Sequence, residues 1–439
     1  MAVILKNDSL RAPEEQPEKP RAVLVSILTD ADTAEDVDES MDELARLLDT
    51  AGGTVAARMV QSRSAPDART LIGSGKVREL ADMCRNLEAS LVVFDCDLTP
   101  VQIRNMEDDI GIEDLRVIDR SMLILDIFAL HAVTAEGKLQ VELAQLQYTA
   151  PRLTGRGTDM SRLGGGIGTR GPGESKLESD RRHMKRRVDA LKAELAVVEK
   201  NRRTMRQSRD RSGLPRIAIV GYTNAGKSTL LNQLTGAAIP ANNRLFDTLD
   251  TTSRLLTVSD TLDVVISDTV GFIRKLPHQL VEAFKATLEE LEYADLLLHV
   301  IDVSNPEWQL QAAVVENLIR ELGAGELPRI DVFNKSDRLP VGEIMPHGED
   351  ICAISARTGE GIDRLLEMID QRLDKGTRRV TIHLPYDKGS LLDMLYREAK
   401  VESVEYSETI DIVAVCPPKV LGQIGDYTPD WTPPKEDWE

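Results

Sequence analysis

Cysteine, aromatic residues and long apolar runs are scarce in this chain of 439 residues. Its four cysteines form no CxxC pair and have no nearby histidine, so the sequence predicts neither a disulfide framework nor a zinc site. The most apolar stretch, 122–133, is interrupted by Asp126 and is too short to span a bilayer. The N-terminus lacks an apolar signal core. We therefore expect a cytoplasmic protein, and we keep a membrane-peripheral fraction as an alternative.

Charge is distributed unevenly along the sequence. The whole chain has 54 Lys or Arg and 73 Asp or Glu, a net charge of −19. A uniformly acidic surface would repel nucleic acid. Residues 151–215, however, hold 17 basic and 8 acidic residues, a net charge of +9, so the rest of the chain carries −28. An RNA partner is therefore compatible with the composition if it binds at this one basic segment.

The basic segment has the pattern of a helical hairpin with a glycine-rich tip. Apolar residues at helical spacing flank a stretch, 155–173, that contains eight glycines, too many for regular structure. We predict that the RNA-binding residues are the arginines of this loop and the basic cluster after it, namely Arg156, Arg162, Arg170, Arg181, Arg182, Lys185, Arg186 and Arg187. The alternative is that these residues only form a solvent-exposed helix face and bind no partner.

Strand-like and helical patterns alternate on both sides of the arm, which predicts a multidomain α/β fold with a mostly parallel sheet in the N-terminal domain. The predicted organisation is a disordered tail over 1–20, an N-terminal α/β domain over 21–120, a helical hairpin arm over 121–212, an α/β domain over 213–376, a small α+β domain over 377–425 and a flexible tail over 426–439.

A phosphate-binding loop is predicted between a short apolar run and a helical stretch. The loop reads Gly221-Tyr222-Thr223-Asn224-Ala225-Gly226-Lys227-Ser228, the GxxxxGKS pattern in a strand–loop–helix context. Its glycines let backbone N–H groups surround phosphates, and the helix N-terminus adds its positive dipole end. We expect Lys227 to neutralise phosphate oxygens in binding and catalysis, and the Ser228 hydroxyl to bind Mg²⁺.

Three downstream motifs favour GTP as the nucleotide. The first reads Asp268-Thr269-Val270-Gly271, where Asp268 would hold Mg²⁺ through water and the Gly271 N–H would approach the γ-phosphate during catalysis. The second reads Asn334-Lys335-Ser336-Asp337, and Asp337 offers the two acceptors that guanine N1–H and N2–H₂ require. The third reads Ser355-Ala356-Arg357, with a backbone N–H for guanine O6. Their order and spacing predict a GTP-binding and GTP-hydrolysing domain.

The segment between the phosphate loop and Asp268 is predicted to contact nucleotide and Mg²⁺. The contact residues we name are Phe246, Asp247, Thr248, Leu249 and Asp250. A threonine here would complete the Mg²⁺ shell and sense the γ-phosphate. Thr248, Thr251 and Thr252 are the candidates, and spacing alone does not choose among them.

Taken together, these segments resemble the HflX-type GTPases of the Obg-like group of translational GTPases. The resemblance rests on GYTNAGKS (221–228), FDTLDTT (246–252), the run from DTVGF to TLEE (268–290), NKSD (334–337) and, most specifically, SRLGGGIGTRGPGESKLE (161–178). It covers residues 21–425 and implies an N-terminal domain, a helical arm, a GTPase domain and a small C-terminal domain. The resemblance also places the Mg²⁺ threonine at Thr248.

The same resemblance implies a partner and a role. Family members bind the large (50S) ribosomal subunit with the glycine-rich tip toward the peptidyl-transferase region, and they split or rescue stalled ribosomes under stress. From the residues alone, a GTP-dependent RNA-remodelling or ribosome-assembly scaffold, in which hydrolysis is incidental, remains an alternative. We expect a monomer. The apolar residues of the two hairpin helices can pack against each other within one chain, so no second chain is needed.

Phe272 follows Gly271 where many GTPases have a glutamine that orients the attacking water. A phenyl ring cannot hydrogen-bond water, so we expect slow intrinsic hydrolysis. One hypothesis is that Asn224 coordinates K⁺ near the phosphates, as similar loops imply; another is that a partner orders the switch segments, 246–252 and 272–278. Packing of Phe272 against the helix predicted over 276–291 is the simpler interpretation, and it is compatible with both.

Overall fold

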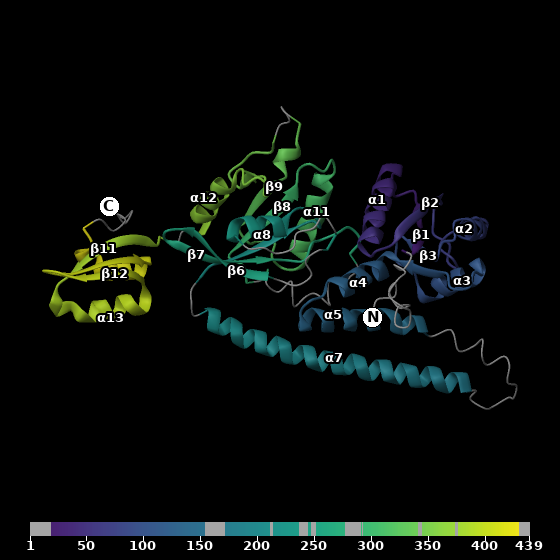
Figure 1. Cartoon of the computed structure of the whole chain (residues 1–439), viewed down its shortest axis with the longest axis horizontal. Coiled ribbons are helices and arrows are strands. Elements are labelled where there is room, and N and C mark those ends of the chain that lie inside the picture. The colour runs from purple at the N-terminus through teal and green to yellow at the C-terminus, as the bar shows by residue number, and fades with distance from the viewer. Residues whose placement is uncertain are drawn as a thin grey trace, which may run out of the picture.

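The computed structural model describes residues 19–153, 172–210, 214–236, 245–246, 252–276, 291, 293–340, 345–373 and 376–429. The N-terminal and central domains lie side by side, the longest helix runs beneath both, and the C-terminal domain stands apart at one end of the molecule (Figure 1). This arrangement agrees with the predicted multidomain α/β fold.

The N-terminal domain is built on a parallel four-stranded sheet in the order β2-β1-β3-β4. Its elements are β1 (Arg21–Leu28), α1 (Ala34–Thr50), β2 (Thr54–Ser62), α2 (Ser74–Asn86), β3 (Leu91–Phe94), α3 (Pro100–Ile110) and β4 (Arg116–Asp119). Neighbouring residues of β1 point to opposite faces: Leu24 packs in the core with α1, and Val25 in the core with α2. The central strands β1 and β3 are covered on both faces and therefore read as nearly continuous apolar runs, whereas the edge strand β2 is largely exposed.

The arm begins with α4 (Arg120–His131), which packs on α1, and continues through α5 (Ala135–Thr149), η1 (Ala150–Leu153) and the long α7 (Pro172–Asp210). α5 packs against α7, as the hairpin prediction requires. Leu191 on α7 is buried, and the residues spaced with it along the predicted seam, Met184, Val188, Leu195 and Val198, are half-buried. The loop residues 154–171 lie outside the described part of the chain.

The central domain has a six-stranded sheet in the order β10-β9-β8-β5-β7-β6, with only β6 antiparallel. Its elements are β5 (Arg216–Gly221), α8 (Lys227–Thr235), β6 (Thr252–Ser259), β7 (Leu262–Asp268), β8 (Leu296–Asp302), α11 (Trp308–Glu321), β9 (Arg329–Asn334), η2 (Ser336–Arg338), β10 (Ile351–Ala353) and α12 (Ile362–Leu373). Ligands of open α/β sheets bind beyond the carboxyl ends of the parallel strands. The predicted GTP motifs follow β5, β7, β9 and β10 at that edge.

The C-terminal domain is a three-stranded antiparallel sheet, β11-β13-β12, covered by helices. Its elements are β11 (Arg378–Leu384), η3 (Tyr386–Lys388), α13 (Gly389–Glu398), β12 (Lys400–Tyr406), β13 (Ile410–Cys416), α14 (Pro418–Ile424) and η4 (Gly425–Tyr427). α14 was not predicted; Pro418 stands in its first turn, where proline is tolerated. Lys400 forms a 2.8 Å ion pair with Asp263 of the central domain.

One apolar core crosses the boundary between the N-terminal and central domains. It joins Leu44 of α1 and Phe128 of α4 to Val220, Phe246 and Phe272 of the central domain. The two domains are therefore packed together by buried apolar surface rather than merely tethered. Within the described residues, no helix is both long and apolar enough to cross a membrane.

Candidate functional site

The phosphate loop joins β5 to α8 with two glycines in conformations that a side chain would not fit. Gly221 has φ +155°, and a Cβ there would lie 2.3 Å from the Val300 carbonyl oxygen. Gly226 has φ +97°, and a Cβ there would lie 2.3 Å from the Asn334 amide nitrogen. Gly221 is therefore required by the close approach of the β8 backbone, and Gly226 by its positive φ together with the Asn334 side chain packed against it.

Lys227 and Ser228 open α8 beside the end of β7. The Lys227 ammonium is buried and donates to the carbonyl oxygens of Gly221 (3.1 Å) and Tyr222 (2.9 Å). Burial lowers the pKa of Lys227 to about 8, although the Asp268 carboxylate acts in the opposite direction. The Ser228 hydroxyl donates to Asp268 at 2.8 Å, so the two predicted Mg²⁺ residues are brought together.

These donors suit Mg²⁺, which prefers hydroxyl and carboxylate oxygens and is usually held by one or two protein groups together with nucleotide phosphates. The described residues contain no cluster of three His, Cys, Asp or Glu that could hold a metal. A Mg²⁺ ion bound by Ser228 and Asp268 would therefore need phosphate oxygens as further ligands. Thr252, one of the three candidate threonines, begins β6 and pairs with Asp268 across the ladder.

The guanine-type motif is joined to the phosphate loop by polar contacts. Asn334 donates from its amide to the Ala225 carbonyl oxygen at 2.8 Å and accepts from the Ala356 N–H at 3.0 Å. Lys335 donates to the Asn224 carbonyl oxygen at 2.8 Å and pairs with Asp302 at 2.6 Å. Asn334 therefore joins three of the predicted segments.

The Asp337 side chain at the end of this motif is positioned by Ser355. The Ser355 hydroxyl donates to one Asp337 carboxylate oxygen at 2.8 Å, while Asp337 is exposed. Ser336 is half-buried and Arg357 is exposed. The arrangement thus presents a fixed carboxylate at the surface, beside the Ala356 backbone that Asn334 binds.

The first switch segment is described only in part. Phe246 is buried, its ring meets Phe128 of α4 edge-on with centroids 4.7 Å apart, and its N–H donates to the Thr223 hydroxyl at 2.9 Å. Five residues predicted here, Asp247, Thr248, Leu249, Asp250 and Thr251, lie outside the described part of the chain.

The second switch segment lies directly on the phosphate loop. The Thr223 N–H donates to the Phe272 carbonyl oxygen at 2.7 Å, and the Phe272 N–H donates to the Gly221 carbonyl oxygen at 3.2 Å. The Thr269 hydroxyl donates to the Ile219 carbonyl oxygen, and Val270 is buried. Phe272 is also buried in the shared core, while most of the helix against which it was predicted to pack, 277–290, lies outside the described residues.

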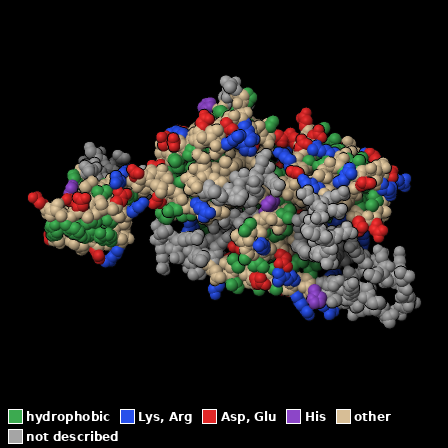
Figure 2. Space-filling view, viewed as in Figure 1, with side chains coloured by type: hydrophobic (Ala, Val, Ile, Leu, Met, Phe, Trp, Pro, Cys, Tyr) green, Lys and Arg blue, Asp and Glu red, His purple; other side chains and the backbone are tan. Residues whose placement is uncertain are grey.

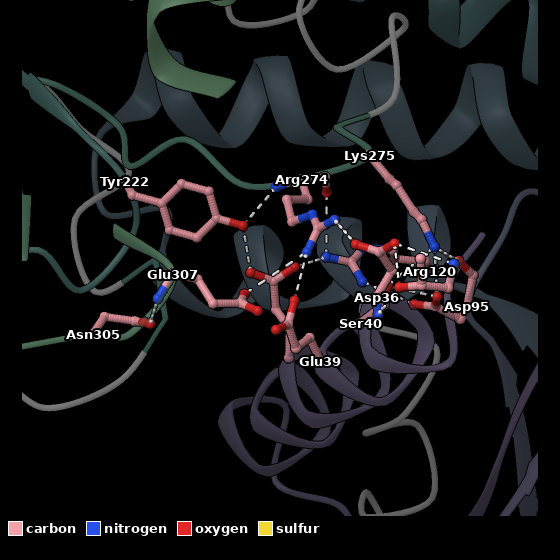
Figure 3. Close-up of polar contacts among 12 residues, drawn as sticks. Asp36, Glu39, Ser40, Asp95, Arg120, Tyr222, Arg274, Lys275, Asn305 and Glu307 are labelled. Carbon is pink, nitrogen blue, oxygen red and sulfur yellow. Dashed lines mark hydrogen bonds and ion pairs between the residues drawn. The ribbon is translucent and has the colours of Figure 1, made fainter. Parts of the chain in front are cut away.

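A polar network between the two domains was not foreseen (Figure 3). Tyr222 donates its hydroxyl proton to Glu43 of α1 at 2.5 Å, and Glu43 pairs with Arg120 at the start of α4. All three side chains are buried. Arg120 also binds Asp95 at 2.9 Å. The sequence contained one signal for this network: a charged Arg120 stands just before the most apolar stretch, 122–133.

The predicted RNA-binding residues are found in two situations. Arg181, Arg182, Lys185, Arg186 and Arg187 are exposed on α7. Figure 2 shows basic side chains along the edge of the molecule that α7 forms. Arg187 makes two 2.7 Å hydrogen bonds to Glu142 of α5, so it also holds the hairpin together. The remaining predicted residues, Arg156, Arg162 and Arg170, lie outside the described residues.

Comparison with known proteins covers nearly the whole chain. Family models match successive segments: GTP-binding GTPase N-terminal over 38–129, GTP-binding GTPase Middle Region over 131–209, 50S ribosome-binding GTPase over 216–335 and HflX C-terminal domain over 343–413. A GTPase HflX of Caldanaerobacter subterraneus is 50% identical over 393 residues, 89% of both chains.

More distant relatives agree. The GTPase HflX of Escherichia coli is 43% identical over 369 residues, 83% of this chain and 86% of the relative. Among solved structures, a GTP-binding protein from Sulfolobus solfataricus in complex with GDP is 26% identical and covers 81% of this chain and 98% of its own, with a TM-score of 0.42. On the family models and curated relatives, the chain belongs to the HflX family and is a GTP-hydrolysing enzyme.

Proposed function

We propose that this GTPase associates with the large ribosomal subunit and splits or rescues stalled ribosomes under stress. The observation that carries the proposal is the exposed basic row on α7, which contrasts with the acidic remainder of the chain. Lys and Arg at such positions attract RNA phosphate. The match of residues 216–335 to the 50S ribosome-binding GTPase model also supports this partner.

Sedimentation tests the proposal directly. The protein is mixed with 70S particles and GTP, GDP or a non-hydrolysable GTP analogue, and free subunits are measured on sucrose gradients. We expect free subunits with GTP or its analogue and few with GDP. Particles that stay intact while the protein co-sediments would favour the alternative of an RNA-remodelling or assembly scaffold. Particles to which the protein does not bind would contradict both.

Within the GTPase site, we assign roles to the predicted residues. Bound Mg²⁺ would neutralise charge on the phosphates, held by Ser228 and Thr248 and, through water, by Asp268. Lys227 would neutralise phosphate oxygens, the Gly271 N–H would donate to the γ-phosphate, and Asp337 would read guanine. The 2.8 Å bond between Ser228 and Asp268 supports the shared metal role of these two residues.

Asn224 would hold K⁺ beside the phosphates and so supply positive charge that Phe272 cannot. Its left-handed backbone, with φ 61°, and its position in the phosphate loop support this role. GTP hydrolysis measured in K⁺ and in Na⁺ tests it: we expect faster hydrolysis in K⁺, and equal rates would contradict a K⁺ site. We further propose a cytoplasmic monomer, because α5 and α7 close their seam within one chain.

A further inference from the structure

The second switch segment, together with Gly271 before it, lies close against Lys227 and the phosphate loop. In phosphate loops of this type the lysine reaches the β- and γ-phosphates, and a backbone N–H of the second switch approaches the γ-phosphate from the other side. Here a Cβ on Gly271 would lie 3.0 Å from the Lys227 ammonium and 2.8 Å from the Thr223 Cα. A triphosphate therefore requires Gly271 and Phe272 to move outward, whereas a diphosphate does not.

Two backbone hydrogen bonds hold this segment against the loop, and the Tyr222 hydroxyl adds a third contact. The Arg274 N–H donates to the Tyr222 hydroxyl oxygen at 2.9 Å. The same hydroxyl donates its proton to Glu43 at 2.5 Å. Burial, followed by the Glu43 charge, raises the pKa of Tyr222, so the hydroxyl keeps its proton and serves as donor and acceptor together.

The N-terminal domain fixes the position of Glu43. Arg120 is buried between Glu43 and Asp95, so the carboxylate that accepts the tyrosine hydrogen bond is held by a buried guanidinium. Lys275 extends the contact: its ammonium binds Asp95 at 2.6 Å and the Ser40 hydroxyl at 3.0 Å (Figure 3). Lys275 itself is exposed, whereas the Arg120 bonds to Glu43 and Asp95 are buried, and charge-assisted bonds are stronger than neutral ones.

We infer that the Tyr222 hydroxyl and Glu43 are specificity-determining positioning groups that set the ratio of GTP to GDP affinity. They stabilise the conformation in which Gly271 lies against Lys227, and the apparent affinity for a ligand falls with the population of its competent conformation. The Tyr222 hydroxyl therefore lowers the affinity for the triphosphate more than the affinity for the diphosphate. This inference rests on nucleotide binding by the GTPase and not on ribosome binding.

The Tyr222→Phe variant tests the inference, because it removes the hydroxyl and keeps the ring. Dissociation constants for fluorescent GDP and for a fluorescent non-hydrolysable GTP analogue are measured on the same full-length preparation. We expect the ratio of GTP-analogue affinity to GDP affinity to rise about tenfold, the size of one lost buried hydrogen bond. A ratio is insensitive to the fraction of folded protein, since both constants share it.

Tyr148→Phe is the matched control. The Tyr148 hydroxyl is buried and hydrogen-bonds Asp119 in the same way, but on α5 and away from the second switch. Its loss should leave the ratio unchanged. Glu43→Gln is the second variant, expected to raise the ratio in the same direction and to add little to Tyr222→Phe in the double variant. An unchanged ratio in Tyr222→Phe, or an equal rise in Tyr148→Phe, would overturn the inference.

Discussion

Two groups of cations in this protein serve opposite purposes. Arg120 and Lys227 are buried, and each is enclosed by oxygen atoms of neighbouring residues. Arg181, Lys185 and Arg186 are exposed on α7 and face solvent. A buried charge must be paired and therefore fixes geometry, whereas an exposed charge mainly contributes a field that salt screens. The first group thus organises the nucleotide site, and the second would attract a nucleic-acid partner.

The largest expected effect is the loss of the buried guanidinium. Arg120→Ala leaves Glu43 buried without a cation beside it and removes one of the partners of Asp95, which should cost about 3–5 kcal/mol of stability. Differential scanning calorimetry of the full chain would show unfolding at a lower temperature.

Two other variants give stability losses with which that of Arg120→Ala can be compared. Arg58→Ala removes an exposed ion pair with Asp42 and should cost less than about 1 kcal/mol. Arg120→Lys should fall between the two, because one ammonium cannot bind two carboxylates as a guanidinium does. Equal losses for Arg58→Ala and Arg120→Ala would remove the distinction between buried and exposed cations.

The second prediction concerns the exposed group. Substituting Arg181, Lys185 and Arg186 together by Ala should weaken 50S binding at least tenfold at low salt and reduce the slope of log affinity against log salt by about two to three. Arg187 is left intact because it holds Glu142. Binding is measured by sedimentation at several KCl concentrations.

A matched triple variant separates local contact from total charge. Arg320, Arg364 and Arg397 are equally exposed but lie on the central and C-terminal domains. Replacing these three by Ala changes the net charge by the same amount and should leave the salt slope nearly unchanged. If the slope falls equally in both variants, 50S binding depends on the total charge of the protein and not on local contact by α7.

Much of the nucleotide site could be predicted from the sequence because its motifs are local. Gly221, Asp268 and Asn334 are each the last residue of a strand, so short local patterns were enough to predict the motifs that they begin. The fold brings them together because the carboxyl ends of parallel strands share one edge. β6 was missed because it is an edge strand with an exposed Leu255 and no long apolar run.

The network between the domains was beyond local patterns for a physical reason. Tyr222 and Glu43 are 179 positions apart, and their bond depends on how α1 docks on the central domain. The Tyr222 hydroxyl therefore could not be given a role from its place in the loop motif. The charge of Arg120 next to an apolar stretch was visible in the sequence, but its burial and the identity of its partners required the tertiary structure.

The smallest expected effect comes from the titration of the buried Lys227. Burial lowers the pKa of Lys227 to about 8, below the value of a free lysine. Phosphate oxygens favour the charged form and raise that pKa, so the complex binds more protons than the free protein as pH rises past 8. Nucleotide affinity should therefore fall by roughly tenfold between pH 7 and pH 9.

Calorimetric titration with GDP in buffers of different ionisation enthalpy would detect the accompanying proton uptake, which should be near zero at pH 7 and approach one proton at pH 9. Lys227→Arg keeps its charge throughout this range and should flatten the profile even though it weakens binding. If the variant and the original protein lose affinity in parallel, the pH dependence arises elsewhere, and the enclosed position of Lys227 does not control its charge.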